Sequence, residues 1–342
     1  MKVFIDDIIY SLQRTGGIST YWREVSSRLK ESLNVAVLSA GQSPFWKSSV
    51  GRKLALVLPI RNRLPSYSLF HSSYLRFSSR KDICNIVTIH DLAGEEGHIT
   101  GLKAYFKKQV QARCIRNADG IVCVSNYTKN MLLKFYRYPE KNIKVIYHGC
   151  SELFRPQEKQ EKSNKILFIG KRDYYKNFNA CIDVLERLPD YQLLIVGGGE
   201  LTANEYGILN SKIEGRFTHY QYVEEEELNR IYNSCFCLIY PSTYEGFGMP
   251  LIEAMKAGCP VIAVDIPVIN EVSGGNVLLV KDANNTDEYL KQVNYLTNQE
   301  LRTNIIKRGL EYAKNFSWNL HVESLIDFYK ETYKRKFTPP TP

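Results

Sequence analysis

The sequence contains no apolar run that approaches the roughly 20 residues a helix needs to cross a bilayer. Its opening residues, MKVFIDDIIY, carry two acids within an apolar segment and indicate a β-strand rather than a secretory signal. The chain has 342 residues, of which 24% are charged and 44% hydrophobic, so it is large enough for two globular domains. We therefore expect a cytoplasmic protein.

Recognisable cysteine and metal patterns are also missing. The eight cysteines are scattered, mostly within apolar segments, and no C-x-x-C pair of the zinc-binding or redox type is present. No cluster of His, Cys and carboxylate residues has zinc spacing, and no D-x-D of the metal-binding kind ends an apolar strand. The sequence predicts buried, reduced thiols, no metal and no cofactor.

The dinucleotide fingerprint G-x-G-x-x-G is absent, although two glycine turns come near it. Gly197, Gly198 and Gly199 follow a predicted strand but lack a third glycine at the required spacing. Gly16 and Gly17 open a predicted helix, where glycine permits close backbone approach and the helix start attracts an anion. We expect an anion-binding turn at Gly16 and Gly17 rather than a dinucleotide site.

Apolar, strand-like segments alternate with amphipathic stretches along the chain, which is typical of parallel sheets with crossover helices. The sequence thus predicts an α/β fold with two Rossmann-like halves. The predicted strands are Val3–Ile5, Val35–Leu38, Leu69–His71, Ile86–Ile89, Ile121–Val124 and Val145–Ile146 in the first half, then Ile166–Ile169, Leu193–Val196, Phe217–Tyr220, Cys237–Tyr240, Val261–Val264 and Val277–Val280. Ligands bind at the carboxyl ends of such strands, so we expect a cleft there.

The polar segment Pro156–Asn164, PQEKQEKSN, predicts a linker between the halves. We accordingly expect an N-terminal domain over residues 1–158 and a C-terminal domain over residues 159–317. A last helix is predicted over residues 318–336, and a disordered tail over residues 337–342.

Positive charge is concentrated in the first half of the chain. Residues 1–150 hold 23 Lys and Arg against 10 Asp and Glu, whereas the remainder holds 22 against 26. Basic residues flank Trp46 and a leucine-rich segment at Lys47, Arg52, Lys53, Arg61 and Arg63, and a second set comprises Lys103, Lys107, Lys108, Arg113 and Arg116. The pattern favours an anionic membrane surface as a partner, with a phosphorylated acceptor, solvated surface charge and a buried Leu54–Leu58 as the alternatives. No nucleic-acid module is present.

The stretch Tyr240–Pro260, YPSTYEGFGMPLIEAMKAGCP, is the most informative part of the chain. It joins an apolar strand to a helix through a glycine-containing turn and separates Glu245 from Glu253 by eight positions. Pro250 suits the first helical position, and the free N–H groups of the helix start would face phosphate. Glu253, expected in the first turn, would repel phosphate and is better suited to bind a diol such as ribose. A favourable first-turn acid is the alternative.

A basic loop, FIGKRDYYKNF, follows another predicted strand and contains Arg172 and Lys176. Arginine can bind a diphosphate through two parallel hydrogen bonds, and lysine acts on it as a point charge. An ordinary solvent-exposed basic loop is the alternative. His90 likewise ends a predicted strand, where a core histidine bonded to the backbone is the alternative to a ligand contact.

Taken together, E-G-F-G-x-P-L-x-E-A-M-x-x-G-x-P resembles the E-x7-E signature of family-4 retaining glycosyltransferases of the GT-B fold, of the type that builds bacterial envelope polysaccharides such as O-antigen. The segment 170–178 resembles the family's G-x-R-x-x-x-K-N-F element, His90 and Asp91 its H-D element, and Gly16 and Gly17 its glycine loop. His148 departs from the family's V-I-x-N-G, so no role passes to it.

The resemblance implies a nucleotide-diphosphate sugar as donor. Arg172 and Lys176 would neutralise the leaving diphosphate, Glu253 would hold the ribose, and Glu245 and His90 would contact the donor sugar. The donor-binding residues it implies are Gly16, Gly17, Val223, Gly246, Phe247, Gly248, Met249, Pro250, Leu251 and Glu253.

The resemblance further implies retaining, metal-independent transfer of a hexose to a hydroxyl of a lipid-linked or cell-envelope glycan, after domain closure. The Y-K-N-F form of the basic loop favours GDP-mannose or a related GDP-sugar. It also implies that the last helix crosses back to the first domain. An epimerase or phosphorylase on the same fold, and a non-catalytic sugar-nucleotide-binding subunit, are the alternatives.

Overall fold

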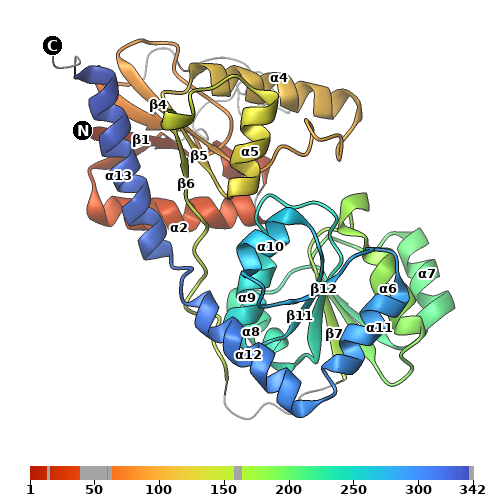
Figure 1. Ribbon diagram of the computed structural model, residues 1–342. Helices are drawn as coiled ribbons and strands as arrows, with labels where there is room; N and C mark the ends of the chain where they lie inside the picture. The colour runs from red at the N-terminus through yellow and green to blue at the C-terminus, as the bar shows by residue number, and fades with distance from the viewer. Residues whose placement is uncertain (14–15, 39–59, 61–63, 158–163, 339–342) are drawn as a thin grey trace. The chain divides into compact units, whose positions relative to one another are not determined.

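A computed structural model describes residues 1–13, 16–38, 60, 64–157 and 164–338 (Figure 1). The chain divides into two compact units. Unit 1 comprises Met1–Gly149 and Ser317–Pro342, and unit 2 comprises Cys150–Phe316. The units therefore divide at Gly149, ahead of the predicted boundary after residue 158, and the last helix belongs to unit 1.

Unit 1 is built on a parallel sheet. Its strands are β1 (Lys2–Asp6), β2 (Val35–Leu38), β3 (Ser68–His71), β4 (Ile83–Ile89), β5 (Gly120–Cys123) and β6 (Ile143–Val145). Within the described residues they pair in parallel in the order β2-β1-β3-β4-β5-β6. Its helices are α1 (Ile8–Leu12), α2 (Gly17–Ser32), α4 (Gly101–Asn117), α5 (Asn126–Phe135) and α13 (Trp318–Phe337), with a short 3-10 helix, η2 (Glu140–Asn142).

Unit 2 repeats this architecture. Its strands are β7 (Lys165–Ile169), β8 (Gln192–Val196), β9 (Phe217–Tyr220), β10 (Cys237–Tyr240), β11 (Val261–Val264) and β12 (Leu278–Val280). In the part of the chain that is described they pair in parallel in the order β12-β11-β10-β7-β8-β9. Its helices are α6 (Phe178–Glu186), α7 (Ala203–Ile213), α8 (Glu225–Ser234), α9 (Met249–Ala257), α10 (Pro267–Ser273), α11 (Thr286–Tyr295) and α12 (Gln299–Ala313), with the 3-10 helix η3 (Tyr174–Lys176).

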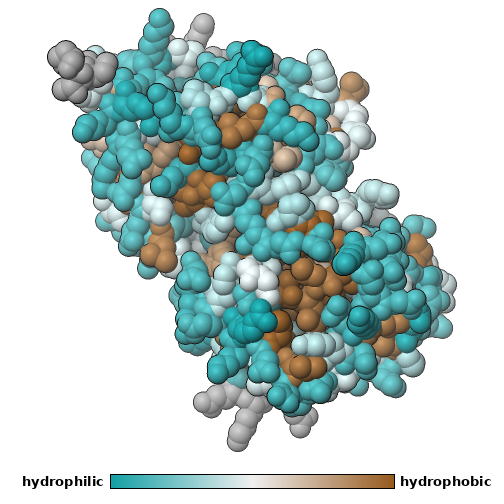
Figure 2. Space-filling view, in the orientation of Figure 1, coloured by the Kyte–Doolittle hydropathy of each residue, from teal (hydrophilic) through white to brown (hydrophobic). Residues whose placement is uncertain are grey.

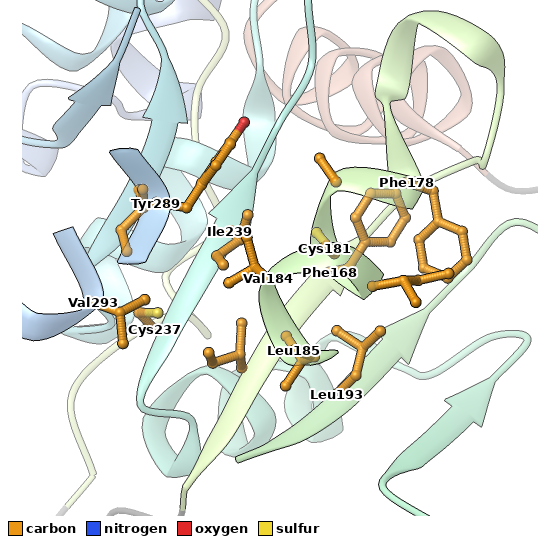
Figure 3. Packing of buried hydrophobic residues seen from close by; sticks show 14 of the residues in the cluster. Phe168, Phe178, Cys181, Val184, Leu185, Leu193, Cys237, Ile239, Tyr289 and Val293 are labelled. Carbon is orange, nitrogen blue, oxygen red and sulfur yellow. The ribbon is translucent and has the colours of Figure 1, made fainter. Parts of the chain in front are cut away.

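The helices pack against these sheets through their apolar faces. In unit 1, α13 lies beside α2 and contacts β4, so the end of the chain completes the first fold (Figure 1). In unit 2, α6 contacts α7 and α11, while α9 contacts α8, α10 and α12. Figure 3 shows side chains from β7, β8, β10, α6 and α11 meeting in one cluster, among them Phe168, Val184, Leu193, Ile239 and Val293. Hydrophilic residues cover much of the visible surface (Figure 2).

The fold predicted from the sequence is confirmed. Fully buried strands such as β5, β10 and β11 consist of the continuous apolar runs that a sheet covered on both faces requires. All eight cysteines are buried, and none forms a disulfide. No helix within the described ranges is both long and apolar enough to span a bilayer.

Candidate active site

The glycine turn between β10 and α9 is fixed by its backbone. Gly248 adopts φ 92° and precedes α9, and a Cβ there would lie 3.0 Å from a Leu251 methyl group. Its carbonyl accepts a 3.0 Å hydrogen bond from the Leu251 amide. Because α9 begins at Met249, Pro250 is its second residue and Glu253 lies beyond the first turn, which corrects both predicted positions. With Leu251 bonded and proline lacking an N–H, the Gly248 and Met249 amides at the helix start have no hydrogen-bond partner among the described residues.

Lys176 and Glu245 form an ion pair at the carboxyl edge of the unit 2 sheet. Lys176 follows β7 and Glu245 follows β10, and the two strands are neighbours. The ammonium lies 2.5 Å from the Glu245 carboxylate and 3.4 Å from the Tyr240 hydroxyl. Glu245 is buried at 8% exposure, and the ammonium lies over the Tyr240 ring at 5.4 Å from its centroid. Such a pair, largely removed from water, holds both charges in a fixed geometry.

Glu253 carries a half-buried carboxyl group that is hydrogen-bonded to a tyrosine. It accepts a 3.0 Å hydrogen bond from the hydroxyl of Tyr232 on α8. Burial raises its pKa to about 7; the Tyr232 bond acts in the opposite sense, and the nearby Glu225 charge adds to the rise. Neutral pH therefore leaves Glu253 divided between its acid and carboxylate forms. A ligand that donates two hydrogen bonds to it would favour the carboxylate.

Arg172 is held within unit 2 and is not free to bind a diphosphate in the predicted two-bond manner. Its Nε donates to Glu205 over 2.7 Å and its Nη1 to the Gly197 carbonyl over 2.8 Å. Its Nη2 lies 3.2, 3.3 and 2.7 Å from the carbonyl oxygens of Gly198, Gly199 and Glu200. The sequence prediction missed this arrangement because β8, which carries the glycine turn, pairs with β7 only in the fold.

Unit 1 places His90 beside a small pocket at the carboxyl end of β4. The pocket is open to solvent, and Ile18, Thr88, His90, Asp91 and Lys107 contribute to its lining. The imidazole packs edge-on against Tyr21 at 4.9 Å and stacks with His148 at 5.6 Å. Its Nε2 is buried and has no hydrogen-bond partner among the described residues. Burial lowers the pKa of His90 to about 4, against the opposing effect of Asp91, so the ring is neutral near pH 7.

The remaining predicted residues have these positions. Gly16 precedes α2 with φ 133°, and a Cβ there would overlap the Gln13 side chain, so this turn requires glycine. Gly17 is the first residue of α2. Val223 is half-buried between β9 and α8, and Phe247 is buried and packs edge-on against Phe316 at 6.1 Å.

Of the two predicted basic segments, the structure describes the second. Lys47, Arg52, Lys53, Arg61 and Arg63 lie outside the described residues, as does Trp46. In α4, Lys107 forms a 2.7 Å ion pair with Asp91, while Arg113 and Arg116 are exposed. The helix also exposes Leu102 at 88% and Tyr105 at 64%. This exposed face therefore combines apolar and basic side chains.

A histidine network in unit 1 was not predicted. His321 Nδ1 lies 2.7 Å from the Tyr147 carbonyl, which can only accept, so this nitrogen carries the proton. With the ring neutral, its Nε2 accepts from the Tyr21 hydroxyl at 3.2 Å. The Tyr21 oxygen then accepts from Thr88 at 3.5 Å, which leaves the Thr88 oxygen to accept from His71 Nε2 at 2.9 Å.

The chain of hydrogen bonds ends on α13. His71 Nδ1 lacks a proton in this tautomer and accepts from the Tyr329 hydroxyl at 2.6 Å. Burial lowers the pKa of both His71 and His321, which keeps the network neutral. No local sequence pattern predicts contacts between residues that are so far apart in the chain.

Two parallel α/β units, one of which gathers cations and carboxylates at the carboxyl ends of its strands, define a glycosyltransferase of the GT-B type. The family models agree with this class. Residues 15–151 match the model described as Glycosyltransferase Family 4, and residues 151–312 match that of Glycosyl transferases group 1. The chain belongs to this family of glycosyltransferases.

Individual relatives point the same way. The chain is 27% identical over 267 residues to O-antigen chain mannosyltransferase B of Escherichia coli, covering 72% of this chain and 70% of that protein. It is 26% identical over 268 residues to O-antigen chain mannosyltransferase RfbU of Salmonella typhimurium, covering 74% of each. Among solved structures, sucrose-phosphate synthase from Thermosynechococcus elongatus has a similar fold, with a TM-score of 0.78 at 18% identity over 98% of this chain and 100% of that one.

Proposed function

We propose that this glycosyltransferase transfers a hexose, with retention of anomeric configuration, from a nucleotide-diphosphate sugar to a hydroxyl of a lipid-linked or cell-envelope glycan. The observation that carries the proposal is the ion pair of Lys176 and Glu245 beside the start of α9. It sets a cation for the diphosphate next to a carboxylate for the sugar hydroxyls, at the edge where parallel sheets bind ligands.

The proposed chemistry is electrostatic. The acceptor oxygen forms a bond to the anomeric carbon on the face from which the diphosphate leaves, and the bond from that carbon to the phosphate oxygen breaks. The acceptor proton passes to a leaving phosphate oxygen, so the products are the glycoside and a nucleoside diphosphate. Lys176, Arg172 and the amides of Gly248 and Met249 would stabilise the charge that develops on the diphosphate.

The carboxylates and His90 would serve different parts of the donor. Glu253 would accept hydrogen bonds from the ribose diol, for which its carboxylate form is required. Glu245 and His90 would bind sugar hydroxyls, and a neutral imidazole with an unpartnered Nε2 suits a hydroxyl better than a phosphate. Gly16 and Gly17 would admit the diphosphate near the start of α2.

A GDP-hexose such as GDP-mannose is the proposed donor, and an O-antigen-type or related envelope glycan the proposed acceptor. The names of two relatives, both O-antigen mannosyltransferases, support this choice. The test is a thermal-shift screen of UDP-, GDP-, ADP- and CDP-sugars, followed by transfer to a lipid-linked acceptor. Stabilisation by none of these donors would overturn the assignment, and an inverted anomeric centre in the product, seen by NMR, would overturn retention.

Metal independence is part of the proposal, because Lys176, Arg172 and the helix amides supply the positive charge that a divalent cation supplies elsewhere. The transfer rate is expected to be the same in EDTA as in buffer with added Mg²⁺ or Mn²⁺. A rate that falls on chelation and recovers with added Mg²⁺ would contradict it.

We further propose that α4 rests on an anionic membrane surface on the cytoplasmic side, where a lipid-linked acceptor would lie. The exposed Leu102 and Tyr105, with Arg113 and Arg116 on the same helix, support this placement. Leu102→Glu should reduce co-sedimentation with phosphatidylglycerol vesicles. Leu320→Glu, at a leucine of α13 that is 53% exposed, is the control. Equal binding to phosphatidylcholine vesicles at any salt concentration would exclude the charge-based mode.

A further inference from the structure

The side chain of Arg172 lies in a socket formed by residues outside the G-x-R-x-x-x-K-N-F motif. The socket consists of the carbonyl groups of Gly197, Gly198, Gly199 and Glu200 and the carboxylate of Glu205. Only 4% of the arginine side chain is exposed. Because the guanidinium is rigid and planar, acceptors on Nε, Nη1 and Nη2 together fix both its position and its orientation.

The glycine turn forms this socket through its conformation. Gly197, Gly198 and Gly199 have φ values of 91°, 79° and 73°, a run in the left-handed region that side-chain-bearing residues rarely adopt. A Cβ on Gly198 would lie 2.3 Å from Arg172 Nη1, whereas one on Gly199 would have no neighbour within 4 Å. Gly198 therefore has a steric role that its neighbour Gly199 does not share.

Glu205 links the socket to a helix. One of its carboxylate oxygens accepts from Arg172 Nε, and the other accepts from the amide and hydroxyl of Thr202 at 2.7 and 2.9 Å. Thr202 and Glu205 form the capping box of α7. Burial opposes ionisation of Glu205, but the hydrogen bonds from Thr202 and Arg172 outweigh it and lower its pKa, so the group is charged at neutral pH.

The socket does not use one N–H group of the Arg172 guanidinium. A guanidinium has five N–H groups, and the contacts above use one on Nε, one on Nη1 and both on Nη2. The second N–H of Nη1 has no hydrogen-bond partner among the described residues. A single directed donor, backed by the full positive charge, differs from the two-bond grip that the motif alone predicts.

We propose that Glu205 and Gly198 are positioning residues that hold Arg172 so that its remaining Nη1 N–H meets the donor diphosphate. This inference rests on the proposed function, in which Arg172 contacts that diphosphate. Neither Glu205 nor Gly198 touches the substrate. They act by removing the conformational freedom that an arginine side chain would otherwise lose on binding.

The first test compares Gly198→Ala with Gly199→Ala. Both substitutions place alanine in a left-handed conformation and should lower thermal stability, Gly198→Ala by more because its Cβ would also lie 3.0 Å from the Gly170 carbonyl oxygen. Only Gly198→Ala displaces the guanidinium, and it should weaken binding of GDP or UDP, whichever the wild type binds, about tenfold by calorimetry, which corresponds to about 1.4 kcal/mol. Binding of the matching nucleoside monophosphate, which lacks the second phosphate, should change in neither variant.

The second test compares Glu205→Gln with Thr202→Ala. Removing the Glu205 charge makes the site more positive, so electrostatics alone predicts tighter diphosphate binding. Loss of positioning predicts weaker binding and a lower kcat, and this is the expected result. Thr202→Ala weakens the α7 cap but leaves the contact between Glu205 and Arg172, so it should lower thermal stability without changing diphosphate affinity.

The outcomes separate this inference from the function on which it rests. A wild-type protein that binds no nucleoside diphosphate would contradict the proposed function. A wild-type protein that binds one, together with Gly198→Ala and Glu205→Gln variants that bind it equally well or more tightly, would overturn the positioning role alone. Equal losses of diphosphate affinity in Gly198→Ala and Gly199→Ala would also overturn it, because backbone strain alone would then explain the weaker binding.

Discussion

The two units share an architecture and both hold ion pairs, which in unit 1 join Arg76 to Asp6 and Lys107 to Asp91, but they differ in their other buried polar groups. Unit 2 keeps charges at the carboxyl edge of its sheet: Lys176 with Glu245, Arg172 with Glu205, and the carboxyl group of Glu253. Unit 1 has a set of neutral histidines and hydroxyl groups joined from Tyr147 to Tyr329. Fixed charges suit stabilisation of a leaving diphosphate, whereas a neutral network suits the joining of distant segments. Similar folds thus hold both charged pairs and neutral hydrogen-bonded networks.

The strongest way to break this contrast is to remove the cation of the ion pair in unit 2. Lys176→Ala should lower kcat by about 10²–10³-fold, because the proposed electrostatic stabiliser of the leaving group is lost and Glu245 is left buried without its lysine partner. Lys171→Ala, at an exposed lysine of the same loop, is the matched control and should keep the wild-type rate. A Lys176→Ala enzyme with unchanged kcat would show that the pair is only structural.

The corresponding test in unit 1 is Tyr329→Phe. It leaves Nδ1 of the buried His71 without a donor and should cost about 1–3 kcal/mol in the free energy of unfolding, measured in denaturant, with little effect on kcat. Tyr333→Phe, on the same helix, removes an exposed hydrogen bond to the Tyr67 carbonyl and should cost much less. Equal effects of the two substitutions would mean that the network does not join α13 to the sheet.

A third prediction uses pH. Glu253 has a pKa of about 7 and the proposed ribose contact requires its carboxylate form, so donor affinity should fall as pH decreases through 7. Affinity for a nucleotide sugar should be about tenfold weaker at pH 6 than at pH 8, as followed by calorimetry. His90, with a pKa of about 4, stays neutral over this range and adds no such dependence. Glu253→Gln should bind weakly with a flat profile, and a persistent slope in that variant would assign the titration elsewhere.

The smallest effect concerns stability. The pKa of Glu253 is raised from 4.5 to about 7 in the folded protein, so its contribution is fully present below pH 4.5 and is lost as pH rises through 7. Glu253→Gln removes this cost and should stabilise the protein at pH 8 by on the order of 1–2 kcal/mol in denaturant titrations, with a smaller gain at pH 5. Destabilisation at pH 8 would mean that the bond from Tyr232 matters more than burial.

The sequence predicted the strands well because each is a short apolar run bounded by turn residues, as at Cys237–Tyr240 and Val261–Val264. It also predicted that Arg172, Lys176, Glu245 and Glu253 follow strands of the same half. It did not predict which of them touch, because the pairing of Lys176 with Glu245 depends on β7 and β10 being neighbours. That strand order is a property of the whole sheet.

Two other features escaped prediction for physical reasons. The three successive glycines at Gly197–Gly199 indicate an unusual backbone, but nothing local in the sequence shows that their carbonyl groups hold Arg172. The sequence does not predict the contacts of His71, His148 and His321, because a lone histidine in an apolar segment gives no indication of its partners. The network that joins His71 and His321 spans 250 positions in the sequence, which local patterns cannot resolve.

The return of α13 to unit 1 has a consequence for the order of assembly during synthesis. A ribosome releases residues 150–316 before it releases His321 and Tyr329, so unit 2 is contiguous and can fold while unit 1 still lacks its last helix. The β-sheet of unit 1 is synthesised first, but α13, which packs against it, is synthesised after unit 2. Until α13 is synthesised, the Tyr21 hydroxyl lacks His321 as a hydrogen-bond partner, and the His71 imidazole lacks Tyr329.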